Sequence, residues 1–244
     1  MVKDSILITG GTRGIGLATA MKYAGQNINI ILTYKNNLNY SKKAKLKLHK
    51  VHKNFQIIKC NAEKKSELNK LSSFIRNNKL KIKTLVNNQG STKYIKKNIK
   101  DIDINLFTEM MNINLFNHLK IINLVLPFMQ NGGSIINVSS IASINGKGSN
   151  IGYCASKAAL DSVTRSLSHS LSPKIRVNSV CPGLTETDMT SKAPKIYLKN
   201  QISITPMNRL ARSEDIADAI YSIAELTNFI NGQCIVVDGG RMLY

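Results

Sequence analysis

Short apolar runs alternate with amphipathic helical patterns from one end of the chain to the other. The runs are rich in Ile and Val, as buried parallel strands are, and they cover residues 5–9, 28–33, 55–60, 84–87, 134–138, 176–181 and 234–237. Apolar residues at helical spacing between them predict helices near 14–25, 39–52, 64–77, 105–129, 152–171 and 213–226. Alternation of this kind implies βαβ crossovers. The pattern therefore predicts an α/β fold, a doubly wound parallel sheet of about seven strands with helices on both faces.

One stretch departs from this alternation. Residues 184–212 contain Pro194 and Pro206 and few strong apolar runs, which predicts an excursion over the sheet edge where a substrate lid would lie. The alternation resumes at Ser213, a residue type that caps helices, and Glu214 and Asp215 then suit a first turn. No linker, repeat or low-complexity tract interrupts the chain. Residues 1–244 are therefore expected to form a single dinucleotide-binding and catalytic domain.

The dinucleotide expectation comes from a glycine-rich loop between the first predicted strand and the first predicted helix. Its glycines permit a tight turn and a close approach of the backbone to a phosphate, and the helix that follows directs unpaired N–H groups at it. Its place at the first strand-to-helix junction is the context that such a site requires. The residues expected at the phosphates are Gly10, Thr12, Arg13, Gly14, Ile15 and Gly16.

The end of the second predicted strand bears on the choice between NAD and NADP. An acid there would bind the ribose 2′-hydroxyl and repel a 2′-phosphate. The strand instead ends in Leu32-Thr-Tyr-Lys35, followed by Asn36 and Asn37. Lys35 and Arg13 are both expected to face a 2′-phosphate, so the sequence predicts NADP(H) as the cofactor.

Tyr153 and Lys157 are four residues apart in a predicted helix, so they share one face about one turn apart. A tyrosine has an unperturbed pKa of about 10, and a positive charge beside it favours the phenolate and lowers that pKa. A pKa of about 7 would require about 4 kcal/mol of differential stabilisation. Lys157 would supply part of this, and a charged cofactor would supply more. Alone the pair is a weak signal, because a helix face with an interfacial tyrosine and a solvated lysine has the same spacing.

Taken together, the motifs resemble those of the short-chain dehydrogenase/reductase family over essentially the whole chain. The matching segments are Thr9-Gly-Gly-Thr-Arg-Gly-Ile-Gly16, Asn87-Asn-Gln-Gly90, Asn112-Ile-Asn-Leu115, Ser140 with Tyr153 and Lys157, Cys181-Pro-Gly183 with Thr187, and Asn231-Gly-Gln with Val237-Asp-Gly-Gly240. They occur in the family's order. The resemblance implies a Rossmann-type fold and a nicotinamide-dependent oxidoreductase.

The resemblance also implies roles for individual residues. Tyr153 would be the general acid for carbonyl reduction, or the base for alcohol oxidation. Lys157 would lower the pKa of Tyr153 and hold the nicotinamide ribose. Ser140 would hydrogen-bond the substrate oxygen where charge develops, and Asn114 would hold a water that links Lys157 to solvent. Further cofactor contacts of the family fall on Asn61, Ala62, Asn88, Gly90, Pro182, Gly183, Thr185 and Thr187.

Two positions depart from the family pattern. Gln89 stands where the family has a small alanine near the adenine ribose, and it is expected to crowd or reshape that contact. Asn61 stands where an aspartate commonly meets the adenine amine. Its amide oxygen can still accept that hydrogen bond, so cofactor binding is expected to survive with altered strength.

Within the family, the chain is most similar to the 3-oxoacyl-(acyl-carrier-protein) reductases, on its length and on residues 183–190 and 207–217. The similarity implies NADPH-dependent reduction of a 3-oxoacyl thioester in fatty-acid synthesis, with acyl carrier protein as the partner and a homotetramer as the assembly. Lys174 falls near a basic carrier-protein contact of these enzymes, whereas Asn131 falls near another position that is often basic. An NADP-dependent alcohol dehydrogenase or ketone reductase of a small metabolite stays open as an alternative. A non-catalytic binding subunit is less favoured, because Tyr153 and Lys157 are both present.

The charge of the chain is unusual for such an enzyme. The formal net charge is +20, and residues 35–100 hold more than half of the Lys and Arg but only Glu63 and Glu67 as acids. An excess of positive charge would suit a surface that binds a polyanion or an acidic protein. A coding bias that places lysines on solvated helix faces would produce the same excess. No zinc-finger spacing or aromatic RNA-binding signature accompanies the lysines, so no nucleic-acid partner is expected.

Compartment and metal content are predicted from absent signals. No apolar run reaches membrane-spanning length, and the first predicted strand leaves no room for a signal peptide. The four cysteines show no C-x-x-C pair or other metal-ligand spacing. The sequence therefore predicts a cytoplasmic protein with reduced thiols, no membrane contact and no metal.

Overall fold

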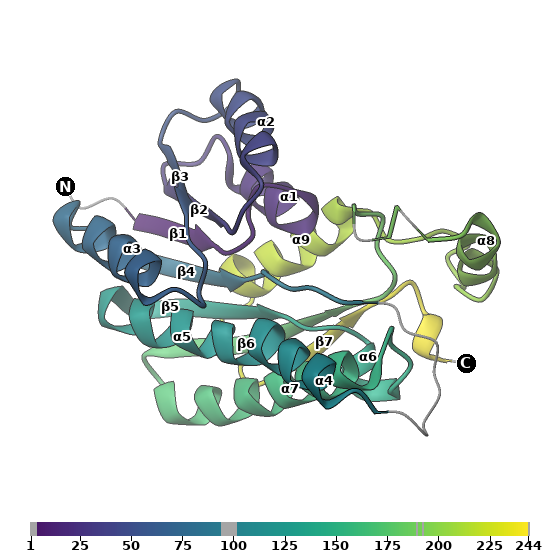
Figure 1. The fold of residues 1–244 in the computed structure, drawn as a ribbon. Coiled ribbons are helices and arrows are strands. Elements are labelled where there is room, and N and C mark those ends of the chain that lie inside the picture. Colours follow the sequence, from purple (N-terminus) through teal and green to yellow (C-terminus); the bar gives the residue numbers. More distant parts are fainter. Residues whose placement is uncertain (1–3, 94–101, 189, 192, 244) are drawn as a thin grey trace.

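Seven parallel strands form one sheet in the order β3-β2-β1-β4-β5-β6-β7 (Figure 1). The structure is a computed structural model that describes all residues except 1–3, 94–101, 189, 192 and 244. The strands are β1 (Asp4–Ile8), β2 (Asn29–Tyr34), β3 (Phe55–Lys59), β4 (Lys81–Asn87), β5 (Met129–Val138), β6 (Ile175–Pro182) and β7 (Cys234–Val237). The order reverses direction between β1 and β4, which confirms the predicted doubly wound fold. In such sheets a ligand binds in the crevice outside the carboxyl ends of the strands at this reversal.

Helices cover both faces of the sheet (Figure 1). Helices α1, α2 and α9 pack on one face, and α3, α5 and α7 pack on the other. Their bounds are α1 (Gly14–Tyr23), α2 (Leu38–His49), α3 (Lys65–Asn77), α4 (Ile104–Met111), η1 (Asn112–Phe116), α5 (Asn117–Val125), η2 (Leu126–Phe128), α6 (Ala142–Asn145), α7 (Ile151–Leu171), α8 (Lys195–Ser203), α9 (Ser213–Tyr221), η3 (Ser222–Leu226) and η4 (Arg241–Leu243).

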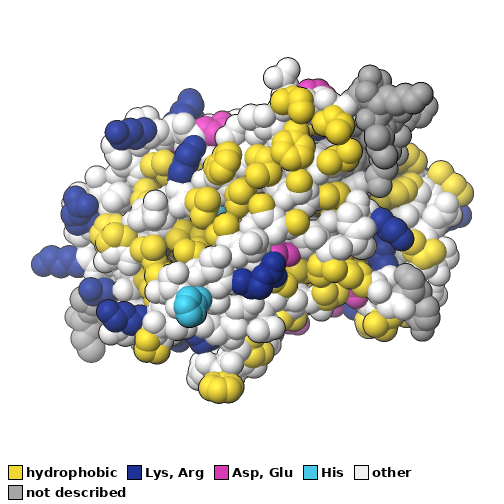
Figure 2. All heavy atoms as spheres, turned by 90° about the horizontal axis from the view of Figure 1, so that it is seen from below, with side chains coloured by type: hydrophobic (Ala, Val, Ile, Leu, Met, Phe, Trp, Pro, Cys, Tyr) yellow, Lys and Arg dark blue, Asp and Glu magenta, His cyan; other side chains and the backbone are white. Residues whose placement is uncertain are grey.

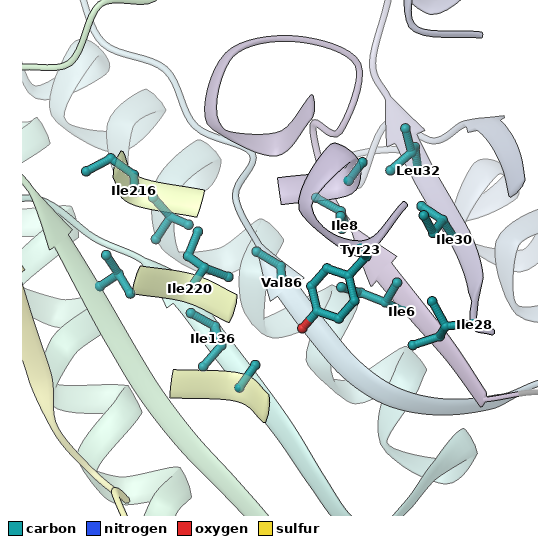
Figure 3. Close-up of a cluster of buried hydrophobic side chains, with 14 of the residues drawn as sticks. Ile6, Ile8, Tyr23, Ile28, Ile30, Leu32, Val86, Ile136, Ile216 and Ile220 are labelled. Carbon is teal, nitrogen blue, oxygen red and sulfur yellow. The ribbon is translucent and has the colours of Figure 1, made fainter. Parts of the chain in front are cut away.

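Two hydrophobic clusters, one on each face, hold the layers together. Strand β1 contributes to both, because successive side chains of a strand point to opposite faces: Ile6 and Ile8 join one cluster and Leu7 joins the other. Figure 3 shows the first cluster, in which side chains from β1 and β2 meet Tyr23 of α1 and the isoleucines of α9. Each fully buried Ile or Leu contributes about 1.5–3 kcal/mol relative to exposure.

The predicted helix over residues 105–129 is in fact four consecutive elements. Helix α4 ends at Met111, a π-helical turn η1 follows, and α5 then runs to a short 3₁₀ turn, η2. The predicted helix over 213–226 likewise ends in a π turn, η3. A π turn carries one extra residue without breaking the helix. Apolar spacing alone therefore predicts one continuous helix in each of these two segments. Such turns often lie at functional sites, and η1 contains Asn114.

Two details of the region around residues 184–212 differ from the prediction. The excursion contains a helix, α8, that has no buried side chain and therefore carries no apolar periodicity from which to predict it. The N-cap of α9 is Arg212, and Ser213 is its first residue, so the prediction of a capping serine is wrong. The carboxylate of Asp215 accepts a hydrogen bond from the backbone N–H of Arg212 at 2.6 Å and closes this turn.

In the part of the chain that the structure describes, no helix has the length and apolar character needed to cross a membrane. The same residues contain no cluster of three or more His, Cys, Asp or Glu side chains suited to a metal ion.

Candidate active site

The glycine-rich loop follows β1 at the carboxyl edge of the sheet. Gly10 and Gly14 have φ angles of +61° and +49°, which side chains other than glycine rarely adopt. A Cβ atom on Gly14 would lie 3.3 Å from Cγ2 of Thr187, and one on Gly16 would lie 2.6 Å from Nδ2 of Asn88. The loop is therefore packed against two other segments that were predicted to touch the cofactor. Its backbone and the start of α1 fit the phosphates of a dinucleotide.

Asn88 holds this loop in place. Its side-chain Nδ2 donates hydrogen bonds to the carbonyls of Thr9 at 3.0 Å and Gly10 at 3.1 Å. Its backbone N–H donates to the hydroxyl of Thr9 at 3.0 Å. The side chain of Asn88, predicted as a cofactor contact, is thus used to join the end of β4 to the phosphate loop.

Tyr153 and Lys157 lie in the first turns of α7, beside the end of β5. The side chain of Asn150 caps this helix by accepting a hydrogen bond from the Tyr153 N–H at 2.7 Å. Lys157 is 4% exposed, and its Nζ donates to the carbonyl of Val138 at 2.7 Å. The hydroxyl of Ser140, just beyond β5, hydrogen-bonds the Tyr153 phenol. The fold therefore brings the predicted serine, tyrosine and lysine together.

The pKa of Tyr153 is raised from its ordinary value rather than lowered. Burial of the phenol is the main cause, and the hydrogen bond with Ser140 opposes it. Lys157 is not among the causes of this shift, and its ammonium is bonded to the Val138 carbonyl. The expected lowering of this pKa by the lysine and a bound cofactor stays a prediction. A raised pKa keeps the phenol protonated at neutral pH, which is the form that a general acid needs.

The pKa of Lys157 is lowered to about 8, chiefly by burial, with an opposing effect of the Asp161 carboxylate. We therefore expect kcat/KM at sub-saturating NADPH to fall above an apparent pKa of about 8, because kcat/KM reports the free enzyme. Below that pH the ammonium is present, and above it the charge beside Tyr153 is lost. Initial rates of NADPH oxidation across the pH range measure this. A kcat/KM that stays constant up to about pH 9.5 would contradict the assignment.

Asn114 lies in η1 and is fully buried. Its Oδ1 accepts from the N–H of Ser91 at 3.0 Å, and its Nδ2 donates to the Ser91 carbonyl at 3.1 Å, so the side chain is fixed at both ends. A Cβ atom on Gly90 would lie 3.2 Å from Asn114 Oδ1 and 3.7 Å from Lys157 Nζ. Asn114, Gly90 and Lys157 are therefore neighbours, and only a glycine leaves the space between them open.

Two ion pairs that the sequence pattern did not reveal involve the cations predicted to face a 2′-phosphate. Lys35 Nζ lies 2.8 Å from Oε1 of Glu63, and Arg13 lies 3.4 Å from Oδ2 of Asp188. The Arg13 guanidinium also lies over the Tyr40 ring, 5.2 Å from its centroid. The hydrogen bond from Lys35 holds the pKa of Glu63 below its ordinary value. Both cations predicted to face a 2′-phosphate thus have acidic partners, one of them from the loop after β3.

The other predicted adenine contacts lie beside Glu63. Asn61 and Ala62 are both buried. Asn61 Oδ1 already accepts from the N–H of Glu63 at 3.1 Å, and its own N–H donates to Glu67 at 2.7 Å. The Asn61 oxygen, which was expected to meet the adenine amine, therefore keeps one lone pair for a ligand.

The segment after β6 packs against the residues that follow β5 and β7 and against the glycine loop. Pro182 accepts from the N–H of Ile141 at 3.1 Å, and Gly183 N–H donates to Val237 at 2.9 Å. A Cβ atom on Gly183 would lie 2.9 Å from the Asp238 Cα, so the two chain segments are in close contact. The turn that follows contains Thr185, whose hydroxyl donates to the Gly183 carbonyl at 3.0 Å, and Thr187, which lies against Gly14.

Gln89 lies elsewhere than the resemblance suggested, and Lys174 lies far from Tyr153 within one chain. The side-chain Nε2 of Gln89 is buried and has no hydrogen-bond partner among the described residues, so this amide points into the protein rather than out toward a ribose. Lys174 follows α7 at the opposite edge of the sheet from Tyr153, and its carbonyl accepts from Gly132 N–H at 2.8 Å, next to Asn131. Since α7 has 21 residues, about 30 Å separates its two ends.

Comparisons with known proteins agree with this architecture. The sequence model of the family described as enoyl-(acyl carrier protein) reductase matches residues 10–241. The chain is 31% identical to the 3-oxoacyl-[acyl-carrier-protein] reductase FabG of Thermotoga maritima, with 97% of each chain covered. It is 30% identical to a 3alpha-hydroxysteroid dehydrogenase of Mediterraneibacter gnavus, over 98% of this chain and 97% of that one.

A solved structure resembles the fold over almost its full length. The short-chain dehydrogenase/reductase SDR:Glucose/ribitol dehydrogenase of Brucella melitensis superposes with a TM-score of 0.89 at 28% identity, and 99% of each chain is covered. The parallel sheet, the phosphate loop at its reversal point and the tyrosine and lysine at its carboxyl edge occur here in one chain. This protein belongs to the short-chain dehydrogenase/reductase family of oxidoreductases.

Proposed function

We propose that this protein uses NADPH to reduce a 3-oxoacyl thioester carried on acyl carrier protein to the 3-hydroxyacyl form, a step of fatty-acid synthesis. The observation that carries the proposal is the Ser140–Tyr153 hydrogen bond beside the buried Lys157, at the same sheet edge as the phosphate loop. The relatives named 3-oxoacyl-[acyl-carrier-protein] reductase support the substrate class.

The proposed binding of the cofactor uses four parts of the cleft. The loop from Gly10 to Gly16 would hold the pyrophosphate, and Tyr153 and Lys157 would hold the nicotinamide ribose. Asn61 and Ala62 would contact the adenine. The residues beside the nicotinamide would be Pro182, Gly183, Thr185 and Thr187. Bound NADPH supplies the hydride, and the protein positions and polarises the substrate.

The proposed chemistry places two hydroxyl groups at the substrate carbonyl. Ser140 donates a hydrogen bond to the carbonyl oxygen as negative charge develops there. Tyr153, kept protonated by its raised pKa, transfers its phenolic proton to the same oxygen. The Lys157 ammonium then stabilises the phenolate, and proton supply passes by way of Asn114. Lys157 is charged below a pH of about 8, so it can do this at neutral pH.

Charge favours a carrier-bound substrate over a free one. The protein has a net charge of +20, and an acidic partner protein would be steered toward it. The second candidate is reduction of a small ketone, which the similarity to a 3alpha-hydroxysteroid dehydrogenase favours. Both reactions need the same catalytic set, so only the substrate distinguishes them.

A substrate panel tests the proposal. Purified protein is assayed for NADPH oxidation with acetoacetyl-carrier protein, acetoacetyl-coenzyme A, a 3-oxosteroid and simple ketones. We expect the highest kcat/KM with the carrier-bound thioester and a decline of that value as salt rises, because salt screens the attraction between the proteins. Activity confined to the steroid or the simple ketones would defeat the fatty-acid assignment.

The preference for NADPH would depend on Lys35, whose ammonium is shared with Glu63. Glu63→Gln removes the competing carboxylate, so we expect the ratio of kcat/KM with NADPH to that with NADH to rise by about 1.5- to 5-fold, the size of exposed charge effects. Lys35→Gln should lower the same ratio. The matched control is Asp218→Asn, which breaks the exposed pair with Lys22 in α1 and should leave the ratio unchanged. A preference of the unmodified protein for NADH would overturn the assignment.

We also propose a homotetramer. Large apolar side chains are exposed on α4, η1 and α7, namely Ile104, Phe116 and Ile151. Figure 2 shows hydrophobic side chains gathered between few charges on the underside of the molecule, where α7 lies. Sedimentation equilibrium tests this assembly, and a monomer at micromolar concentration would contradict it.

A further inference from the structure

Asp161 of α7 is a buried carboxylate to which the proposed chemistry gives no role. It is 4% exposed, and its Oδ2 accepts a hydrogen bond from the Cys181 thiol at 3.8 Å. Its Oδ1 has no hydrogen-bond partner in the part of the chain that the structure describes. A thiol is a weak donor, and burial of a charge is costly unless an opposite charge compensates it. A positive charge close to Asp161 is therefore expected.

Helix α7 places Lys157 one turn before Asp161 on the same face. Both residues are 4% exposed, so both side chains lie between the helix and the sheet. Lys157 Nζ bonds the Val138 carbonyl of β5 at 2.7 Å, and Asp161 reaches Cys181 of the neighbouring strand β6. In the register of β5 and β6, Val138 pairs with Val180, the residue before Cys181. The ammonium and the carboxylate therefore reach adjacent positions of two paired strands.

The titratable groups that act on Lys157 from α5 and from the start of α7 carry no charge at neutral pH. Burial raises the pKa of the Tyr153 phenol, so the phenol stays protonated. Burial and the charge of Lys157 lower the pKa of His118 in α5 to about 3, so its imidazole is neutral. Neither group can compensate the buried ammonium.

Two thiols, in β6 and β7, and one guanidinium also lie near Asp161. The hydrogen bond with Cys234 and burial raise the pKa of the Cys181 thiol, so Cys181 is neutral as well. Arg165 lies one turn beyond Asp161, but its guanidinium donates to the Cys234 sulfur at 3.4 Å and forms no ion pair with Asp161 among the described residues. Asp161 is thus the carboxylate that acts on the Lys157 ammonium.

We propose that Asp161 is a positioning residue of the active site, and that its carboxylate keeps the Lys157 ammonium charged at neutral pH. Burial disfavours an ammonium. It lowers the pKa of Lys157, and the Asp161 carboxylate opposes this effect, so that the pKa stays at about 8. Without the carboxylate this pKa would fall further, and the ammonium would lose its proton near neutral pH. The effect on turnover rests on the proposed function, whereas the effect on the ammonium does not.

The pH profile of Asp161→Asn tests this role. Removal of a nearby opposite charge shifts a pKa by about 1 unit or more, so the alkaline limb of kcat/KM at sub-saturating NADPH should move from about 8 to about 7. The loss should be about eightfold at about pH 8.5 and negligible at about pH 6, where the ammonium is present in both proteins. A loss by the same factor at every pH, or an alkaline limb that does not move, would overturn the proposal.

Two further variants separate the charge of Asp161 from its packing. Asp161→Leu removes the same charge and leaves no polar atom to satisfy, so it should move the alkaline limb as Asp161→Asn does. Asp218→Asn changes the net charge equally, but it breaks an exposed pair with Lys22 and should leave the limb in place. Circular dichroism checks the fold of each variant. If neither Asp161 variant folds, Asp161 is a structural residue and the proposal is wrong.

Binding of NADPH gives a readout that needs no substrate. Lys157 is proposed to hold the nicotinamide ribose, so the Kd from NADPH fluorescence should rise above about pH 8 in the unmodified protein and above about pH 7 in Asp161→Asn. If this shift occurs in a protein without reductase activity, the proposed function fails and the role of Asp161 stands. If the unmodified protein reduces the carrier-bound thioester but both Kd values rise at the same pH, the role of Asp161 is wrong.

Discussion

Tyr153→Phe is expected to lower kcat for carbonyl reduction by about 10²–10⁴-fold, the range that a positioned general acid contributes. The substitution removes only the phenolic oxygen, so the ring still packs at the start of α7. Binding of NADPH should stay within a few-fold of the unmodified protein, because Lys157 and the glycine loop are untouched. Single-turnover rates and fluorescence titration measure the two effects separately.

Ser140→Ala is the matched comparison for Tyr153→Phe. Ser140 also accepts a hydrogen bond from the backbone N–H of Ala142 at 3.1 Å, so its loss removes a partner of the substrate oxygen and loosens this turn without removing the acid. We expect a smaller loss of kcat than for Tyr153→Phe. If Tyr153→Phe kept more than about a tenth of kcat, the proposed acid role would be rejected.

Glu225→Ala is expected to lower the free energy of unfolding by about 2–4 kcal/mol, because it leaves several polar groups without partners. The Glu225 side chain is 9% exposed and lies 2.6 Å from Lys83 Nζ. It also accepts hydrogen bonds from the Tyr23 hydroxyl at 2.8 Å and the Thr84 hydroxyl at 2.9 Å. Tyr23 belongs to the cluster in Figure 3. Partial exposure of Lys83 places the loss below that of a fully buried ion pair.

The control for Glu225→Ala is Glu109→Ala. Glu109 pairs with Lys93 at the same 2.6 Å, but both side chains are exposed, so the loss should be about 0–1 kcal/mol. Urea unfolding followed by circular dichroism measures both variants. Equal losses would show that the network around Glu225 contributes no more than a surface pair.

The same carboxylate predicts how stability depends on pH. Burial raises the pKa of Glu225, but hydrogen bonds from Lys83, Tyr23 and Thr84 outweigh it and hold the pKa below its ordinary value. A group with a depressed folded pKa stabilises the fold above its unfolded pKa and stops doing so as pH falls through the folded pKa. The difference in unfolding free energy between the unmodified protein and Glu225→Gln should therefore shrink below about pH 4.3. A difference that is constant with pH would contradict this.

The sequence predicted the sheet well because buried parallel strands are continuous apolar runs. The run at 234–237 and the start of β3 match the structure, and the other strands differ by a few residues at their ends. The largest difference is β5, which begins at Met129 rather than at 134, because its first residues, through Gly132 and Gly133, carry no apolar run. The glycine loop and the Tyr153–Lys157 pair are also local patterns, and the fold places both at the carboxyl edge of the sheet.

The parts that the sequence did not predict depend on contacts between distant segments. Glu63 pairs with Lys35 across 28 positions, and Asp188 pairs with Arg13 across 175, so the end of the second strand alone could not reveal these acids. The inward direction of Gln89 depends on where β4 meets α5. Helix α8 buries nothing, and η1 differs from an α-helix by one residue. Spacing within an element contains none of this information.

We expect a hydride from NADPH to reduce a carrier-bound 3-oxoacyl group in this site. The most direct test uses NADPH with deuterium at the transferable position of the nicotinamide, incubated with the purified protein and acetoacetyl-carrier protein. After release from the carrier, the product is analysed by mass spectrometry. The expected product is a 3-hydroxybutyryl group that carries the deuterium on its hydroxyl-bearing carbon. If this product does not form, or forms without deuterium, the proposed reaction is wrong.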